Sequence, residues 1–317
     1  MMHRVGVQTA HWYQESDPDG SFAYIKSCGF DTVDFSMATK LHGSHIKKGE
    51  LTTFFDQSLD EIFEFYRPVK AALQKNDVTI YQMHAPFPLW VKPKEDQPAY
   101  DADKINAYVV MAFEKMCAVA DYLDCRAIVC HPVTRSTKEK EWETNLELFR
   151  SLMPGAKKYK VKICIENLFG SYKGRIIEGA CTEAEEACRY VDFLNEEAGE
   201  EIFGFCLDIG HATLMKRNLY QYIKLLGHRL TCLHIHDNDG TDDLHMMPYT
   251  YTHTWGQNLV TDWEGFIKGL REIGYAGDLC FETFRVNGVF PKELWDHVFR
   301  LISATGRYFV KRIEEEK

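Results

Sequence analysis

The chain has 317 residues, of which 45% are apolar and 13% aromatic, so it is long enough to bury the core of a globular enzyme. Lys and Arg total 37 against 47 Asp and Glu, a formal net charge of −10. This balance argues against a nucleic-acid partner, because such binding depends on Lys and Arg neutralising phosphates. The chain also contains no apolar stretch whose length approaches the roughly 20 residues that a membrane span requires.

Eight apolar runs of strand-like composition alternate with segments of helical period, which predicts a single (β/α)8 TIM barrel domain over residues 1–317. A doubly wound open sheet is the alternative, but its strands spread laterally and would not gather residues from six successive strands. The predicted strands are Arg4–Thr9, Phe30–Ser36, Val78–His84, Arg126–His131, Val161–Glu166, Ile202–Asp208, Leu230–His236 and Asp278–Thr283.

Helical stripes lie between the predicted strands. One runs from Leu59 to Leu73, where Pro68 should kink or split the helix, and another from Ile105 to Leu123. Residues 261–264, Thr-Asp-Trp-Glu, match a capping box that would open the helix before the last strand.

Ten cysteines include no Cys-x-x-Cys pair, and five of them lie inside strand-like runs, where a small buried thiol is ordinary. The N-terminus shows no signal-peptide pattern, so we expect free thiols in a cytoplasmic protein. The five are Cys130, Cys164, Cys206, Cys232 and Cys280.

Potential metal ligands lie at or just past the ends of six of the predicted strands. In a barrel these ends meet on one face, where the chemistry of such enzymes is found, so we expect one site. The ligand candidates are His84, His131, Glu166, Asp208, His211, His234, His236, Asp243, His245 and Glu282.

Four of these candidates, Glu166, Asp208, His234 and Glu282, come from the last four strands, which are adjacent in a barrel. Three carboxylates and one imidazole suit a divalent ion such as Mn²⁺, Zn²⁺, Co²⁺, Mg²⁺ or Fe²⁺, and leave two positions for substrate oxygens on an octahedral ion. His236 lies two residues past His234 and so on the same strand face, and period alone does not decide which of the two is the ligand.

The remaining candidates extend the site in ways that stay open. His84 and His131 could serve a second metal that shares Glu166, or bind substrate hydroxyls, and His211, Asp243 and His245 could form a third metal site or a polar wall. A phosphate or carboxylate could be bound by Lys173, Arg175 or Arg285, although solvated surface charge is the favoured interpretation of these residues. Aromatic residues in the same loops suit the C–H faces of sugars, namely Trp12, Phe87, Trp90, Tyr172, Tyr249, Tyr251 and Trp255.

In this order and spacing, the motifs resemble those of the xylose-isomerase-like superfamily over nearly the whole chain. They are His84-Ala-Pro, His131-Pro, Glu166-Asn, Asp208-x-x-His211, His234-x-x-Asp, Asp243-x-His245 and Glu282-Thr. The superfamily includes sugar isomerases and epimerases, inosose dehydratases and endonuclease IV-type enzymes. The resemblance implies nine ligand positions and favours His234 over His236.

The resemblance implies a metal-dependent sugar isomerase or epimerase, with proton transfer beside a metal-chelated carbonyl. It implies Glu166 and Glu282 as the proton-transferring pair and His211 as a further catalytic residue. The substrate-binding candidates are His84, His131, Trp12, Trp90, His236, Asp243, His245 and Trp255.

The resemblance also leaves two alternatives, a keto-sugar dehydratase or lyase and an abasic-site phosphodiesterase. A ketose 3-epimerase would carry Arg and Glu where this chain has Gly240 and Tyr172, so the usual substrate clamp is absent. Related barrels often form homo-oligomers.

Overall fold

The computed structural model describes residues 3–52, 54–94, 100–135, 137–253 and 258–315. Its main sheet has eight parallel strands in the order β10-β1-β2-β3-β4-β5-β8-β9, which confirms the predicted (β/α)8 barrel. The strands are β1 (Val5–Gln8), β2 (Thr32–Ser36), β3 (Thr79–His84), β4 (Ala127–Cys130), β5 (Lys162–Glu166), β8 (Phe203–Asp208), β9 (Leu230–His234) and β10 (Leu279–Phe281).

The barrel closes between its last two strands. Ile235, just past β9, forms a parallel bridge with Phe281 on β10, and the Ile235 amide donates to the Cys280 carbonyl at 2.9 Å. Closure brings Glu282 beside the end of β9, because its amide donates to the Ile235 carbonyl at 3.1 Å.

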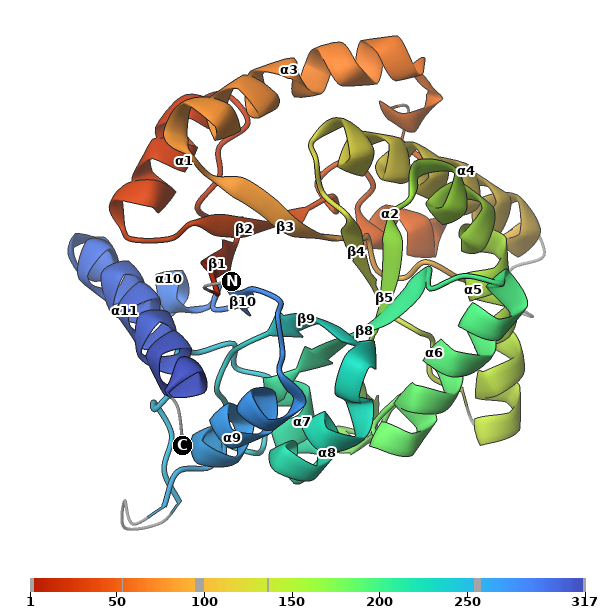
Figure 1. Cartoon of the computed structure of the whole chain (residues 1–317). Coiled ribbons are helices and arrows are strands. Elements are labelled where there is room, and N and C mark those ends of the chain that lie inside the picture. The colour runs from red at the N-terminus through yellow and green to blue at the C-terminus, as the bar shows by residue number, and fades with distance from the viewer. Residues whose placement is uncertain (1–2, 53, 95–99, 136, 254–257, 316–317) are drawn as a thin grey trace.

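Helices surround the strands in a ring, with α11 lying along the side that holds β1 and β10 (Figure 1). The longer ones are α1 (Pro18–Ser27), α3 (Leu59–Asn76), α4 (Ala102–Tyr122), α5 (Lys138–Tyr159), α6 (Ala184–Ala198), α8 (Leu219–Leu226), α9 (Trp263–Ile273) and α11 (Trp295–Glu314). Shorter helical segments are α2 (Gly43–Lys48), α7 (Ile209–Leu214), α10 (Val286–Val289) and 3-10 turns at Phe54–Asp56, Gly227–Arg229 and Lys292–Leu294.

Two local expectations differ from the structure. Helix α3 continues through Pro68 for 18 residues, so the proline does not split it. Helix α9 is capped by Asp262, whose carboxylate accepts from the Gly265 amide, and not by Thr261. The predicted capping box is therefore wrong by one residue, because the Thr261 hydroxyl donates instead to the buried carboxylate of Asp237 at 2.6 Å.

The interior of the barrel is apolar and contains several thiols. All ten cysteines are free and all five in strand-like runs are buried, as expected. Cys164, Cys206 and Cys232 pack with Ala127 and Val129 in one cluster.

One element was not anticipated, an antiparallel hairpin of β6 (Phe169–Tyr172) and β7 (Arg175–Glu178) that follows β5. Among the described residues, no helix combines the length and the apolar character needed to cross a bilayer.

Candidate metal centre and its cavity

The four predicted metal ligands converge at the carboxyl ends of β5, β8, β9 and β10. His234 Nδ1 lies 3.3 Å from Glu166 Oε2, 3.3 Å from Glu282 Oε2 and 3.9 Å from Asp208 Oδ2. All four side chains are at least nine-tenths buried. One imidazole nitrogen therefore faces an oxygen of each of the three carboxylates.

The orientation of His234 is set by a residue that the sequence reasoning missed. The other ring nitrogen, Nε2, donates to Asp34 Oδ2 at 2.8 Å, and Gln82 Nε2 donates to the same oxygen at 3.0 Å. With its proton on Nε2, the ring presents the lone pair of Nδ1 to the carboxylates. The available signal was a charged residue in the middle of a strand-like run, between Val33 and Phe35.

The imidazoles of His84, His211 and His245 are oriented in the same way, with one ring nitrogen held by a hydrogen bond and the other facing a carboxylate. Each ring donates from Nδ1 to a backbone carbonyl. The pairs are His84 with Ala85 at 2.7 Å, His211 with Asn167 at 2.8 Å and His245 with Glu282 at 3.1 Å. Each Nε2 then points toward a carboxylate, and such outer hydrogen bonds are typical of metal-binding histidines.

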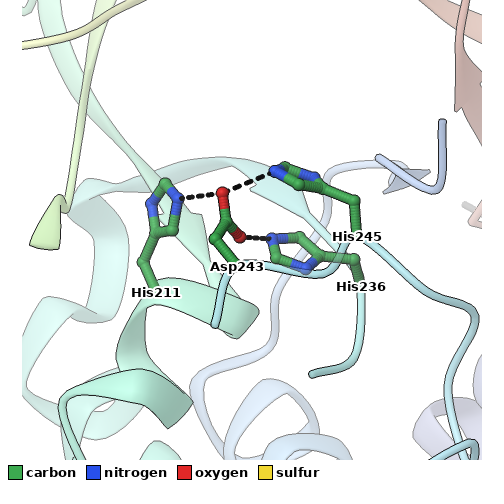
Figure 2. Close-up of side chains that lie close together, drawn as sticks. All are labelled: His211, His236, Asp243 and His245. Carbon is green, nitrogen blue, oxygen red and sulfur yellow. Dashed lines mark hydrogen bonds and ion pairs between the residues drawn. The ribbon is translucent and has the colours of Figure 1, made fainter. Parts of the chain in front are cut away.

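Asp243 gathers three imidazoles beside the central four residues (Figure 2). Its Oδ2 lies 2.8 Å from His245 Nε2 and 3.7 Å from His211 Nε2, and its Oδ1 lies 3.8 Å from His236 Nε2. Ligand atoms of these four residues lie within 4.8 Å of one another, as a metal ion would require.

A third group extends the site toward β3 and β4. His131 Nε2 lies 3.0 Å from Glu166 Oε2 and His84 Nε2 lies 3.6 Å from the same oxygen. Glu166 Oε2 is thus approached by His84, His131 and His234. All nine ligand positions of the resemblance are therefore brought together.

Charges in this assembly shift the pKa of several groups. Burial alone would lower the pKa of His84 and His211, but Glu166 raises that of His84 to about 8, and Asp208 and Asp243 raise that of His211 to about 10. Burial opposes ionisation of Glu166, yet His131 and His234 hold its pKa well below the usual range. The ionised form of Glu166 is therefore favoured, and it depends on nearby positive charge.

The donor set fits a divalent metal ion. Glu166 Oε2 and His234 Nδ1 are buried, and neither has an aligned hydrogen bond within the described part of the chain. Buried polar atoms without partners are costly, and a cation between three carboxylates and one imidazole would satisfy them. Oxygen and nitrogen donors in this ratio suit the borderline or hard divalent ions.

The site opens into a cavity of about 550 Å³, a size typical of small-molecule sites. Among its lining residues are five of the predicted substrate or ligand positions, namely His84, His131, His211, Asp243 and His245, together with Glu166 and Glu282. Phe87, an aromatic candidate from the sequence, also lines it.

Several lining residues were missed by the sequence reasoning. Gln8, at the end of β1, donates from Nε2 to Glu282 Oε1 at 2.6 Å. His42 and Lys47, from the loop and short helix after β2, bring possible hydrogen-bond and cationic groups to the rim. A polar residue ending an apolar strand was a signal for Gln8, whereas nothing in the local pattern marked the other two.

Three predicted substrate-binding residues that the structure describes do not line this cavity, although His236 belongs to the cluster around Asp243. Trp12 is buried against α11, with its ring centroid 3.7 Å from that of Phe299, and Trp90 is half-buried against the core. His236 is fully buried, its Nε2 lies 3.0 Å from the Asp208 carboxylate, and its ring stacks on that of His245. None of the three is among the lining of this cavity as described, and Trp255 lies outside the described residues.

A family model described as "Xylose isomerase-like TIM barrel" matches residues 22–305 of the chain. An uncharacterized protein from Methanocaldococcus jannaschii, MJ1311, is 23% identical over 230 residues, which cover 70% of each chain. A second uncharacterized protein, y4fM from Sinorhizobium fredii, is 32% identical over 83 residues, so the match spans about a quarter of either chain (26% of this one and 24% of that one).

Several solved structures, two of them of sugar epimerases, share the fold. The 3-keto-D-glucoside 4-epimerase YcjR from E. coli superposes with a TM-score of 0.68 at 16% identity, over 96% of this chain and 99% of that one. D-psicose 3-epimerase from Clostridium cellulolyticum H10 gives 0.64 at 18% identity, over 97% and 99%. The IOLI protein with a bound zinc atom gives 0.63 at 17%, over 98% and 97%.

Proposed function

The chain belongs to the xylose isomerase-like TIM barrel family, and from that premise we propose that it is a metal-dependent sugar isomerase or epimerase. The observation that carries the proposal is the meeting of Glu166 and Glu282 at one imidazole nitrogen of His234, on the floor of a cavity of sugar-accommodating size. The epimerases that share the fold support the same class of reaction.

A divalent ion held by Glu166, Asp208, His234 and Glu282 would polarise a sugar carbonyl and a neighbouring hydroxyl, which acidifies the adjacent C–H bond. We propose Mn²⁺, Zn²⁺, Co²⁺, Mg²⁺ or Fe²⁺ for this role, and the bound zinc of the IOLI protein supports a site of this type. His84, His131, Asp243 and His245 then serve substrate hydroxyls or hold weaker additional ions.

Proton transfer falls to the two glutamates. They project from β5 and from the end of β10, which are not neighbours in the barrel, and so approach the cavity from different sides. One carboxylate removes the proton beside the carbonyl and the other returns it, which inverts that carbon. Return by the same carboxylate at the neighbouring carbon would give isomerisation instead.

His211 is suited to stabilise charge that develops on a substrate oxygen. It lines the cavity, and its Nδ1 lies 3.5 Å from Glu166 Oε1. Although burial opposes protonation, the carboxylates of Asp208 and Asp243 raise its pKa to about 10, which favours the cationic form of the ring. A protonated imidazole is a strong hydrogen-bond donor to an oxyanion.

The test is a deuterium-exchange screen. Metal-loaded protein is incubated in D₂O with a panel of ketoses, keto-sugars and their phosphates, and NMR reports deuterium at carbons beside a carbonyl. We expect incorporation for at least one sugar and none with Glu166→Gln. An enediolate could also expel a β-hydroxyl, so a lyase product in the same spectra would redirect the assignment to a dehydratase.

A second candidate is an abasic-site phosphodiesterase, which the convergence of all nine ligand positions favours. The net charge of −10 argues against it. Cleavage of an oligonucleotide containing an abasic site, with affinity falling steeply between 50 and 200 mM salt, would replace the proposal above.

A further inference from the structure

A second cavity of about 660 Å³ adjoins the first one. It is lined by His11, Phe284, Arg285, Asn287, Gly288, Val289 and Trp295. Phe284 lines both cavities, and its ring centroid lies 4.2 Å from that of His245 in the first and 6.4 Å from that of His11 in the second. The Phe284 side chain is therefore a shared wall between the metal centre and this second space.

Asn287 in the second cavity carries an unsatisfied amide. Its Oδ1 and Nδ2 are both buried, and neither has a hydrogen-bond partner among the described residues. A buried amide without partners costs free energy, and a rotation of the Asn287 side chain toward the cavity it lines would let a ligand with adjacent hydroxyls use both its donor and its acceptor. The side chain thus points to a polyhydroxylated ligand rather than a purely apolar one.

The other lining residues suit the same ligand. Trp295 is anchored by a hydrogen bond from Nε1 to the Phe290 carbonyl at 3.0 Å, which fixes its ring at the edge of the cavity. Aromatic faces complement the C–H faces of sugar rings. The exposed guanidinium of Arg285 adds up to five donors for hydroxyl oxygens.

We propose that this cavity is a subsite for a second sugar ring, so that the substrate is a disaccharide or related glycoside and not a free monosaccharide. The inference rests on the proposed function, because it assigns the reacting ring to the cavity of the metal centre. The second ring would lie beyond Phe284, with its hydroxyls on Asn287 and its C–H face on Trp295.

Gly288 allows a direct test, because a Cβ at this position meets no atom within 4 Å and its backbone conformation is open to other residues. Gly288→Trp should fill the second cavity and leave the metal centre intact. Calorimetry on metal-loaded protein would compare D-fructose with turanose, maltulose and isomaltulose, which carry a glucosyl group on different oxygens of fructose. Leu301→Trp, at an exposed position of α11, is the matched control.

We expect at least one disaccharide to bind wild-type protein at least about tenfold more tightly than D-fructose. Gly288→Trp should remove that advantage without changing D-fructose binding, and Asn287→Ala should weaken the disaccharide about threefold to tenfold. Wild-type protein that prefers no disaccharide, or a Gly288→Trp variant that binds as wild type does, would overturn the subsite.

Deuterium exchange on the same samples separates the two proposals. Selective disaccharide binding without deuterium exchange would support the subsite and refute the isomerase. Deuterium exchange on D-fructose, with no preference for a disaccharide, would support the isomerase and refute the subsite.

Discussion

Asp34→Asn should weaken metal binding although Asp34 contributes no ligand atom of its own to the cluster. Asp34 Oδ2 accepts from His234 Nε2 at 2.8 Å and from Gln82 Nε2 at 3.0 Å, and all three side chains are buried. An amide oxygen in the same place can accept from both donors, so the substitution removes the charge and keeps the shape.

The size of the effect follows from these contacts. A hydrogen bond to a charged group contributes about 1.5–3 kcal/mol, against about 0.5–1.5 for a neutral one, so losing the charge costs about 1–1.5 kcal/mol. That corresponds to about tenfold in affinity, the lower end of the roughly 10–100-fold measured when such outer partners of metal ligands are removed. The carboxylate matters because it raises the basicity of Nδ1 across the ring.

Competition between the protein and a chelating dye would measure this change. Asp31→Asn is the matched control, because Asp31 precedes β2 at the opposite end from the site and pairs with Arg307 at 2.7 Å. It should leave metal affinity unchanged. Wild-type affinity in Asp34→Asn, with the fold preserved by circular dichroism, would refute the argument that the buried charge tunes His234.

Four further outcomes follow from the same geometry. Glu166→Gln or Asp208→Asn should abolish tight metal binding with the fold intact, as metal analysis of purified protein would reveal, and no divalent ion in wild-type protein would contradict the metal centre. Glu282→Gln should retain some metal but slow deuterium exchange by at least about a hundredfold, and an unchanged rate would make Glu282 a ligand only. Calorimetric titration of metal-free protein should give one tight site with any others weaker, and several equally tight sites would argue for a multinuclear centre. Ser58→Ala, which removes the capping box of α3, should lower the free energy of unfolding by about 1 kcal/mol without altering exchange.

The sequence by itself determined the barrel and the face on which the site lies. Apolar runs of four to eight residues alternating with helical stripes predict parallel strands, and barrel closure places all their carboxyl ends together. Glu166 and Asp208 end two such runs, and His234 lies two residues before the end of a third, so their convergence needed no knowledge of side-chain contacts.

Local patterns failed where the partner of a side chain comes from a distant segment. Trp12 has the composition of a sugar-binding loop residue, yet it stacks on Phe299, nearly the whole chain away. Thr261 has the spacing of a helix cap, yet its hydroxyl is used by Asp237. In each case the contact that decided the role is long-range, and spacing along the chain carries no information about it.

Tertiary structure alone decided which atoms face the centre. Strand alternation places His234 and His236 on the same face, but β9 ends at His234, and His236 lies 3.0 Å from the Asp208 carboxylate in the cluster around Asp243. The choice of ring nitrogen came from Asp34 on β2, and the second oxygen of Glu282 was taken by Gln8 on β1. Periodicity fixes a direction for each side chain, whereas hydrogen bonds across a closed barrel depend on distances between strands that are remote in sequence.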